Sequence, residues 1–319
     1  MSRKLSLSRR TGIAALVALG LAGALSAPLH AAASKPRVAL VMKSLANEFF
    51  QTMQEGARAH QRAHAAEYDL IANGIKDEID TAGQIRLVEQ MLAQHVDAIV
   101  IAPADSKALV PALDAALKRG VVVINIDNRL DQQALAEKHI TVPFVGPDNR
   151  AGAKLVGDFL AQQLHKGDKV GIIEGVPTTF NAQQRTLGFK DAMQVAGVQV
   201  VAVQSGQWEL QKGNIVAAAM LREHRDLAAL LCGNDTMALG AVAAIKSAAK
   251  TGQVKVVGYD NIPAVKPLLA DGRMVATADQ FASQQAEFGI VAALTTLANK
   301  PGNKPLPAVT NTRVELVTK

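Results

Sequence analysis

The sequence predicts an α/β protein made of two similar doubly wound lobes, each built on a parallel sheet. From Lys35 onward, short apolar runs alternate with helical patterns that carry one apolar stripe, the rhythm of repeated βα units. This alternation stops across 127–146 and then starts again. Of the 319 residues, 49% are hydrophobic and 19% are charged, a composition typical of a globular protein with a sizeable core.

The first half of the chain gives four strands and three helices. Pro103 ends an apolar run, and Gly120 follows a helical pattern as a C-terminal cap. We expect strands at 37–42, 68–73, 98–102 and 121–126, and helices at 48–65, 81–94 and 109–119. The polar stretch 127–146 is interpreted as a crossover to a second lobe.

After the crossover the same alternation returns. We expect strands at 169–175, 198–204, 228–232, 254–259, 274–278 and 314–317, and helices at 149–165, 181–195, 210–223, 235–249, 265–270 and 280–297. The Pro- and Gly-rich stretch 300–307 precedes the last strand. Two copies of one pattern in about 285 residues predict two lobes with a cleft between them.

The first 33 residues have the pattern of an export signal. Arg3, Lys4, Arg9 and Arg10 form a basic start, and residues 12–25 form an apolar stretch too short to span a membrane. Small residues at 29–33 offer a cleavage site. The arginine pair resembles a twin-arginine signal, but Gly12 stands where a bulky residue is usual, which favours the general secretory route.

Removing this segment lowers the formal net charge from +6 by four, to +2, which argues against a nucleic-acid partner. Cys232 is the only cysteine, so no internal disulfide can form, and it follows an apolar run like a small buried residue. We therefore expect a soluble protein of the bacterial periplasm.

Polar and aromatic side chains follow the expected strands. In an open parallel sheet the carboxyl ends of the strands form the edge where ligands bind. The residues at these ends are Asn47, Phe49, Phe50, Asp127, Asn128, Arg129, Arg185, Trp208, Asn234, Asp235, Asp260, Asn261, Asp279 and Gln280. Carboxylates accept hydrogen bonds from hydroxyl groups, Arg donates in a fork, and Asn and Gln do both. Such a set suits a neutral polyhydroxylated molecule whose C–H faces pack on aromatic rings.

Each residue also has a purely structural interpretation. Asn234 or Asp235 can cap a helix, and Asp260 with Asn261 suits a turn. Phe49 and Phe50 can both be core residues, although only one ring of an adjacent pair is expected to face the core side of a helix. The ligand-binding interpretation depends on the whole set sharing one edge.

The motifs at 44–50 (SLANEFF), 126–127 (ID), 185–189 (RTLGF), 234–240 (NDTMALG) and 257–260 (VGYD) resemble those of periplasmic sugar-binding proteins of the ribose-binding type. The resemblance covers nearly all of the chain after the signal. It implies a binding component of an ABC importer that captures a monosaccharide or polyol between two closing lobes. Its partners would be a membrane permease and, in some members, a chemotaxis receptor.

By this resemblance the ligand set is Asn47, Phe49, Phe50, Asp127, Asn128, Arg185, Trp208, Asn234, Asp260 and Gln280. Trp208 stands where the ribose binder has a smaller aromatic residue, and Asn128 where it has an arginine, so a pentose, a hexose or a polyol all stay open. The resemblance implies three crossovers, near 145–147, 279–281 and 308–310. The expected lobes are 34–145 with 281–308, and 146–280 with 309–319, after the signal at 1–33.

Two other classes of function, an enzyme and a transcription regulator, share some of these features. An enzyme could use Asp127, Asp260 and Arg185 in acid–base chemistry, but the chain has no nucleophile triad, metal-ligand cluster or dinucleotide fingerprint, so no cofactor is expected. A lactose-repressor-type regulator shares the two-lobed domain, but it carries a helix-turn-helix where this chain carries an export signal. The sugar-binding interpretation accounts for more of the sequence.

Overall fold

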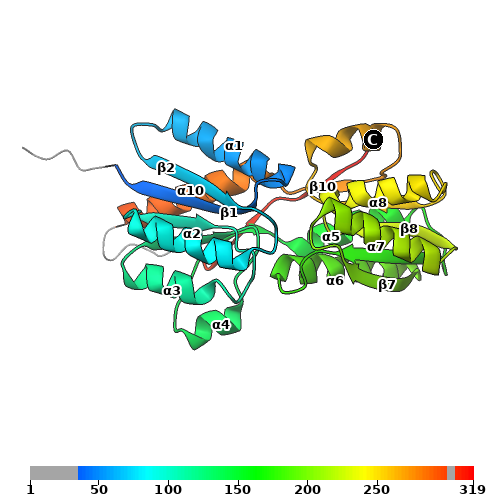
Figure 1. Ribbon diagram of the computed structural model, residues 1–319, viewed down its shortest axis with the longest axis horizontal. Coiled ribbons are helices and arrows are strands. Elements are labelled where there is room, and N and C mark those ends of the chain that lie inside the picture. The colour runs from blue at the N-terminus through cyan, green and yellow to red at the C-terminus, as the bar shows by residue number, and fades with distance from the viewer. Residues whose placement is uncertain (1–34, 300–305) are drawn as a thin grey trace, which may run out of the picture. The chain divides into compact units, whose positions relative to one another are not determined.

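The computed structural model describes residues 35–299 and 306–319, and it confirms an α/β fold of two lobes with parallel sheets (Figure 1). The expected export signal at 1–33 lies outside the described residues, as does most of the Pro- and Gly-rich stretch. Within the described part, no helix is both long and apolar enough to cross a membrane.

The first lobe contains a sheet of six parallel strands in the order β11-β5-β4-β3-β1-β2. These strands are β1 (Arg37–Ser44), β2 (Asp69–Ile75), β3 (Ala98–Ile101), β4 (Val122–Ile126), β5 (Phe144–Pro147) and β11 (Val309–Thr312). Helices α1 (Glu48–Ala63) and α10 (Ala282–Ala298) pack on one face, and α2 (Thr81–Ala93) and α3 (Val110–Lys118) on the other.

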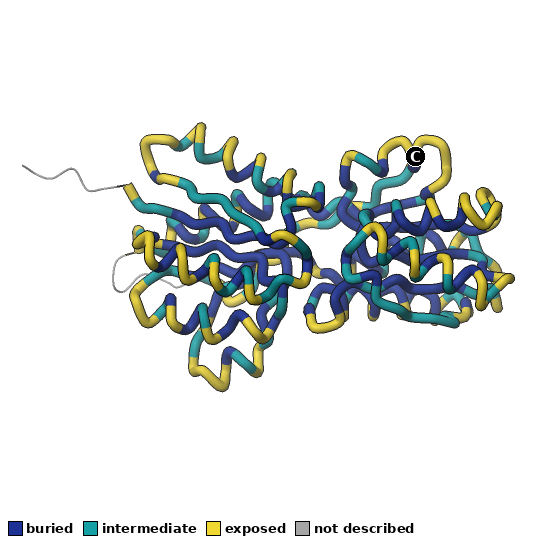
Figure 2. Tube along the Cα trace, in the orientation of Figure 1, coloured by how far each residue is buried: buried dark blue, intermediate teal, exposed yellow. Residues whose placement is uncertain are grey.

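Alternation along β1 explains why both faces of this sheet are covered. Val38 and Leu40 pack with residues of α1 and α10, whereas Ala39 and Val41 pack with residues of α2 and α3. All four side chains are fully buried, because successive residues of a strand point to opposite faces. Figure 2 shows the central strands of both lobes as buried segments, whereas the edge strands β2 (Asp69–Ile75) and β7 (Gln199–Ser205) are mostly intermediate.

The second lobe contains a sheet of four parallel strands in the order β7-β6-β8-β9. These are β6 (Lys169–Glu174), β7 (Gln199–Ser205), β8 (Leu227–Cys232) and β9 (Lys255–Val257). Its helices are α5 (Asn149–Ala161), α6 (Phe180–Ala196), α7 (Leu210–Glu223), α8 (Asp235–Ser247) and α9 (Lys266–Ala270), with the 3-10 turn η1 (Pro263–Val265) before α9. Helices α5 and α6 cover one face, and α7 and α8 the other.

The two sheets share one strand order. In each lobe the first strand, β1 or β6, lies between the second strand and the third. The chain therefore leaves the first strand toward one side and later returns to its other side, which opens a crevice at the carboxyl ends of the strands. The residues that follow β1, β4, β6 and β8 are placed at these crevices.

The chain crosses between the lobes three times: from β5 to α5, from β10 (Thr277–Asp279) to α10, and from β11 to β12 (Glu315–Val317). The third crossing follows Thr312, later than the expected 308–310. The reason is strand β11, which is not among the expected strands and which pairs in parallel with β5. Residues 309–312 thus join the first sheet, and not the second lobe to which 309–319 was assigned.

Two further elements differ from expectation. The segment expected as a strand at 274–278 does lie parallel to β9, with one bridge between Ala276 and Val257, but its end forms β10, which pairs antiparallel with β12. The stretch 127–146, interpreted as a crossover, holds the short helix α4 (Gln132–Glu137), capped by the Asp131 carboxylate, which accepts from the Ala134 N–H at 2.8 Å. Since α4 precedes β5, this stretch belongs to the first lobe.

Candidate functional site

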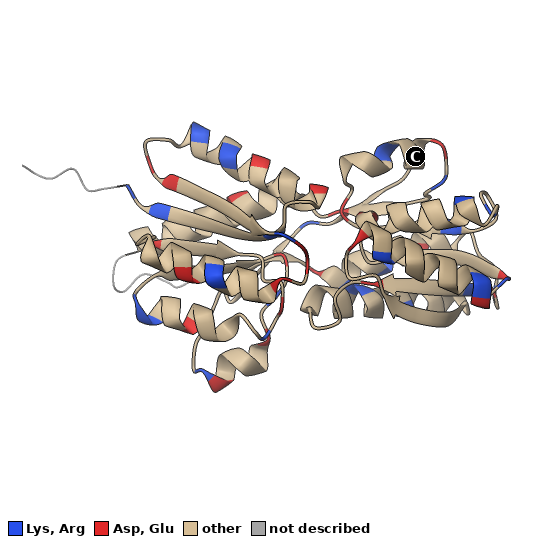
Figure 3. Ribbon diagram, in the orientation of Figure 1, with Lys and Arg blue, Asp and Glu red and all other residues tan. Residues whose placement is uncertain are grey.

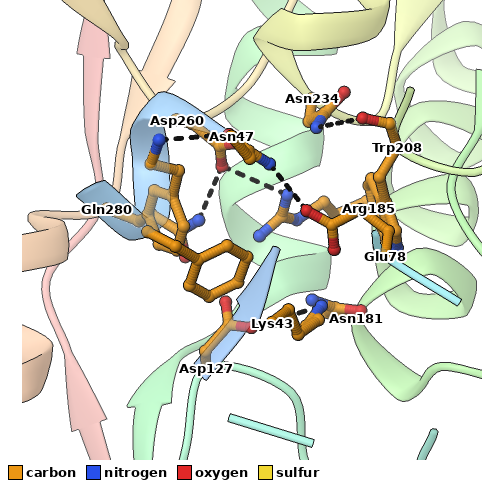
Figure 4. A pocket seen from close by; sticks show the side chains of 12 residues that line it. Lys43, Asn47, Glu78, Asp127, Asn181, Arg185, Trp208, Asn234, Asp260 and Gln280 are labelled. Carbon is orange, nitrogen blue, oxygen red and sulfur yellow. Dashed lines mark hydrogen bonds and ion pairs between the residues drawn. The ribbon is translucent and has the colours of Figure 1, made fainter. Parts of the chain in front are cut away.

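A cavity with an empty volume of about 230 Å³ lies where the carboxyl ends of the strands of both lobes meet (Figure 4). The lining residues are Lys43, Asn47, Phe49, Phe50, Glu78, Asp127, Asn181, Arg185, Trp208, Asn234, Asp260 and Gln280. The structure thus gathers nine of the ten expected ligand residues around one hollow.

Asn128 is the exception. It is fully buried, and its side chain is turned away from the cavity: Nδ2 donates to the Pro103 carbonyl at 2.9 Å, and Oδ1 accepts from the Asn181 N–H at 3.2 Å. Asn128 is therefore placed among backbone groups, and not beside Asp127 on the cavity wall.

Lys43 and Asp127 form the charged part of the first-lobe wall. Lys43 Nζ lies 3.5 Å from Asp127 Oδ2, and each side chain is at most 3% exposed. The ammonium group also lies 5.5 Å from the ring centre of Phe50 and 5.6 Å from that of Trp208. Asp127 Oδ2 accepts no hydrogen bond within the described part of the chain. A buried carboxylate oxygen with unused acceptor capacity is a strong point for a hydroxyl donor.

Asn47 and Glu78 form a second polar pair on the same wall. Asn47 caps α1, with Oδ1 accepting from the Phe49 N–H at 3.0 Å, while Nδ2 donates to Glu78 Oε1 at 3.0 Å. Burial raises the pKa of Glu78 to about 7, against the opposing charge of Lys43. The cap fixes the amide, so the Asn47–Glu78 pair presents a defined arrangement to the cavity.

Phe49 and Phe50 both line the cavity, although only one ring was expected to do so. Their centroids lie 5.1 Å apart at an interplanar angle of 82°, an edge-to-face pair. Both rings also belong to the hydrophobic core of the α1 face, with exposures of 3% and 2%. The core and cavity interpretations are thus both correct, because the cavity borders directly on the core.

Arg185 organises the second-lobe wall. From α6, Nε donates to Asn149 Oδ1 at 2.8 Å, and Nη1 donates to the Gly233 carbonyl at 2.9 Å and to Asp260 Oδ1 at 3.3 Å. The guanidinium carbon lies 3.8 Å from the ring centre of Tyr259. These contacts hold Arg185 in one orientation before any ligand is present.

Asp260 is also held by residues at the crossing from β10 to α10. Gln280 Nε2 donates to Asp260 Oδ1 at 2.6 Å, and Gln285 Nε2 donates to Gln280 Oε1 at 3.1 Å. Burial raises the pKa of Asp260 to about 7, although Arg185 opposes the shift. Gln280 and Asp260 therefore act as one preorganised unit.

Trp208 closes one side of the cavity, and glycines make room for it. A Cβ atom on Gly175 would lie 2.0 Å from the indole ring, so no larger residue fits there without displacing it. Trp208 is 3% exposed, and its Nε1 has no hydrogen-bond partner within the described residues. The indole thus offers the cavity an apolar face and an unused donor.

Three lining residues have left-handed backbone: Asp127 (φ 58°), Trp208 (φ 66°) and Asp260 (φ 114°). This conformation is uncommon for residues with a side chain and costs on the order of 1–3 kcal/mol where the fold enforces it. Such positions concentrate at binding sites, and here each lies in a turn at the cavity edge.

Sequence reasoning missed three lining residues: Lys43, Glu78 and Asn181. Lys43 gave little signal, since it stands between the apolar run 38–42 and Ser44, and only the structure shows that it is a buried charge of β1. Asn181 is the second residue of α6 and was treated only as a helix start. Glu78 lies in a loop after β2, where an acidic residue does not by itself indicate a binding site.

The lobes also contact each other directly around the cavity. Ser106, in the loop after β3, accepts from the Phe180 N–H at 2.9 Å, and Glu48 Oε2 accepts from the Ala264 N–H at 3.1 Å. Thr236 Oγ1 lies 3.4 Å from Asn47 Oδ1. These bonds define a closed arrangement of the two lobes.

The chemistry of the site is that of a hydrogen-bonding cage. It combines carboxylates, amides and two cations with three aromatic rings, and no group of His, Cys, Asp or Glu residues in the described part could hold a metal ion. Figure 3 shows both signs of charge spread over the helices of both lobes, with no face of one sign in that view. A small ligand with many hydroxyl groups and an apolar face matches this set of partners.

Known proteins show the same architecture. A family model described as a periplasmic binding protein domain matches residues 38–301. A D-ribose/D-allose-binding protein of Pseudomonas aeruginosa is 65% identical over 284 residues, 89% of either chain. A ribose import binding protein of Escherichia coli is 32% identical over 86% of this chain and 90% of its own.

Solved structures agree with these relatives. An ABC transporter solute-binding protein of Burkholderia multivorans, with an unknown ligand, has a TM-score of 0.87 and 62% identity, covering 90% of this chain and all of that one. A periplasmic solute-binding protein of Actinobacillus succinogenes with bound D-allose has a TM-score of 0.83 and 34% identity, covering 89% of this chain and 98% of its own.

Proposed function

Because the chain belongs to the family of periplasmic binding protein domains, we propose that it is the sugar-capturing component of an ABC importer. The observation that carries the proposal is the cavity lined by residues of both lobes. The relatives named above bind sugars, which favours this function over an enzyme or a regulator of transcription.

The ligand we propose is a monosaccharide of the ribose and allose type. The relative with 65% identity is a D-ribose/D-allose-binding protein, and the structure from Actinobacillus succinogenes holds D-allose. As pyranoses, these two sugars share the configuration of their ring hydroxyl groups and differ by one hydroxymethyl group. One cage of fixed donors and acceptors can therefore serve both.

The two walls have complementary roles in this proposal. Asp127 and Glu78 accept from sugar hydroxyl groups, and Lys43 and Arg185 donate to sugar oxygens. Phe49, Phe50 and Trp208 pack on the C–H faces of the ring. Since the ligand touches both lobes, it binds the closed form more tightly than the open form and shifts the population toward closure.

The ligand set of the proposal is the gathered nine residues together with Lys43, Glu78 and Asn181. Asn128 leaves the set because its side chain is bonded elsewhere. The expected export signal at 1–33 accounts for delivery to the periplasm. There the closed, loaded protein would be recognised by a membrane permease and, in a second role, by a chemotaxis receptor.

Titration calorimetry on the chain from residue 34 onward tests the proposal. We expect D-ribose and D-allose to bind with one site per chain, and a thermal-shift screen of pentoses, hexoses and polyols to rank them first. Failure of every sugar and polyol to bind would refute the proposal. Strong binding of a different monosaccharide would keep the transport function and correct the ligand class.

A further inference from the structure

We propose that Ser106 and Asn128 form a clasp that closes the lobes by capping helix α6 from the opposite lobe, and so set the affinity without touching the ligand. This inference rests on the proposed function, which it extends from ligand contacts to the closure equilibrium. The clasp is defined as Ser106 and Asn128 of the first lobe with the N–H groups of Phe180 and Asn181.

The N-cap residue of helix α6 supplies no side-chain cap, and within the helix the Asn181 Oδ1 accepts only from the Ala182 N–H, at 2.9 Å. This N-cap residue, Thr179, makes no capping bond, because its hydroxyl donates to the Val176 carbonyl at 2.7 Å. The first N–H groups of a helix have no partner within the helix and need one from elsewhere. By contrast, α1, α2, α5 and α8 are each capped by the Asn or Asp directly before them.

The missing cap comes from the first lobe. The Phe180 N–H donates to Ser106 Oγ at 2.9 Å, and the Asn181 N–H donates to Asn128 Oδ1 at 3.2 Å. Ser106 is 5% exposed and Asn128 is fully buried; the bond to Asn181 is buried, and the bond to Phe180 is partly buried. The two acceptors therefore satisfy two N–H groups that in an open form would have to turn to water.

Both acceptors are held in place before the lobes meet. Ser106 Oγ donates to the Arg129 carbonyl at 2.8 Å, which leaves its lone pairs free to accept. Asn128 Nδ2 donates to the Pro103 carbonyl at 2.9 Å, which points Oδ1 toward α6. Since all of these partners belong to the first lobe, closure needs no rearrangement of the clasp.

The position of Asn128 links the clasp to the ligand. It follows Asp127, whose left-handed backbone turns the chain so that the two neighbouring side chains point to different places. On the other side, α6 carries Arg185 about one turn beyond the capped end. Closing the clasp therefore brings both charged residues to the cavity together.

A clasp that favours closure changes affinity in a characteristic way. The apparent dissociation constant equals the intrinsic one divided by the fraction of protein in the competent form. Loss of one hydrogen bond of the closed form should lower that fraction about 3- to 10-fold where the open form dominates. The same factor should apply to every ligand, because neither Ser106 nor Asn128 lines the cavity.

The test compares Ser106→Ala and Asn128→Ala with wild type by calorimetry on D-ribose and D-allose. We expect each variant to weaken both sugars by the same factor of about 3 to 10. Thr179→Val is the matched control, since it removes a buried hydroxyl bond at the same helix end within one lobe. It should lower thermal stability and leave both affinities within about twofold of wild type.

A second measurement needs no sugar. Spin labels at Lys138→Cys and Lys190→Cys, both exposed, report the distance between the lobes, and the native Cys232 is fully buried. We expect Ser106→Ala and Asn128→Ala to lower the closed fraction of the ligand-free distance distribution by the same factor as the affinities. An unchanged closed fraction, or losses of affinity that differ between the two sugars, would overturn the clasp. Absence of sugar binding by wild type would instead count against the proposed function, while the label distances still decide the clasp.

Discussion

The two walls of the cavity use their charges differently. In the second lobe, Arg185 and Asp260 are bonded to each other and to Asn149, Gly233 and Gln280. In the first lobe, Lys43 and Asp127 form one long ion pair, and Asp127 Oδ2 accepts no hydrogen bond among the described residues. The polar groups of Arg185 and Asp260 are thus bonded within the protein, whereas Asp127 keeps an unused acceptor for a ligand. We expect substitutions in either wall to weaken binding, and substitution of Arg185 to lower stability more than substitution of Asp127.

The largest effect should follow Arg185→Met. This change leaves the Asp260 carboxylate buried without its cation, and breaking a buried pair in this way costs about 3–5 kcal/mol. We expect a loss of sugar binding together with a lower unfolding midpoint in urea. Arg150→Met is the control, since it removes an exposed pair with Asp191 on the neighbouring helices and should leave the midpoint nearly unchanged. Wild-type stability of the Arg185→Met variant would show that the Arg185–Asp260 pair does not stabilise the folded protein.

Asp127→Ala should weaken binding strongly. It also leaves the buried Lys43 ammonium without its ion-pair partner, so we expect a lower unfolding midpoint as well. A charge-assisted hydrogen bond contributes about 1.5–3 kcal/mol, so we expect a 10- to 150-fold weaker affinity for D-ribose in calorimetry. Asp131→Ala, in the same connection after β4, removes only the cap of α4 and should lower stability without changing affinity. Wild-type affinity in Asp127→Ala would remove this residue from the ligand set.

The pH dependence of stability should involve both walls. Burial raises the pKa of Glu78 and of Asp260 to about 7 from ordinary values of 4.5 and 3.8. A carboxyl group whose pKa is raised by folding stabilises the folded state when protonated, so the free energy of unfolding falls as pH rises from about 4 to 7 and then levels. Asp235, which burial also shifts upward in pKa, adds to the same trend.

Urea unfolding of the ligand-free protein at pH 5, 6, 7 and 8 measures this dependence. We expect the Glu78→Gln, Asp260→Asn double variant to show a flatter profile than wild type. If the two profiles are parallel, the carboxyl groups of the cavity do not titrate in this window.

The smallest effect expected is spectroscopic. Trp208 is the only tryptophan, it lines the cavity, and its Nε1 lacks a partner among the described residues. Binding of D-ribose or D-allose should therefore change the emission of the protein, with a midpoint equal to the calorimetric affinity. In Asp127→Ala that midpoint should move to higher sugar concentration. A saturable calorimetric signal without any change in emission would place the ligand away from the indole ring.

The sequence predicted most of the fold because its core strands are short apolar runs between well-marked helices. It missed β5, which was interpreted as part of a crossover, and β11, whose residues Thr310 and Asn311 are exposed on an edge strand and lack an apolar signal. The later third crossing follows from the missed β11. Strand pairing of this kind depends on tertiary contacts, which local patterns do not record.

The candidate site was predictable to the extent that it follows strand ends. Asn47, Asp127 and Asp260 were found because polar residues directly after apolar strands meet at one edge. The direction of each side chain was not predictable. Asn128 follows Asp127 in sequence, yet backbone turning sends the two side chains to different partners. Lys43 was not predicted because it belongs to strand β1 and precedes the turn at 44–50, from which the ligand residues were predicted.

The left-handed backbone at Asp127, Trp208 and Asp260 limits how this pocket can be redesigned. Asn and Asp tolerate that conformation and Gly adopts it freely, whereas Val, Ile and Thr are strongly disfavoured there. A mutant library intended to change the preferred sugar should therefore allow many residue types at Lys43, Glu78 and Asn181. It should allow only a few residue types at the three positions with left-handed backbone. New specificities in proteins of this chain's lineage would be expected to arise first on the positions with ordinary backbone.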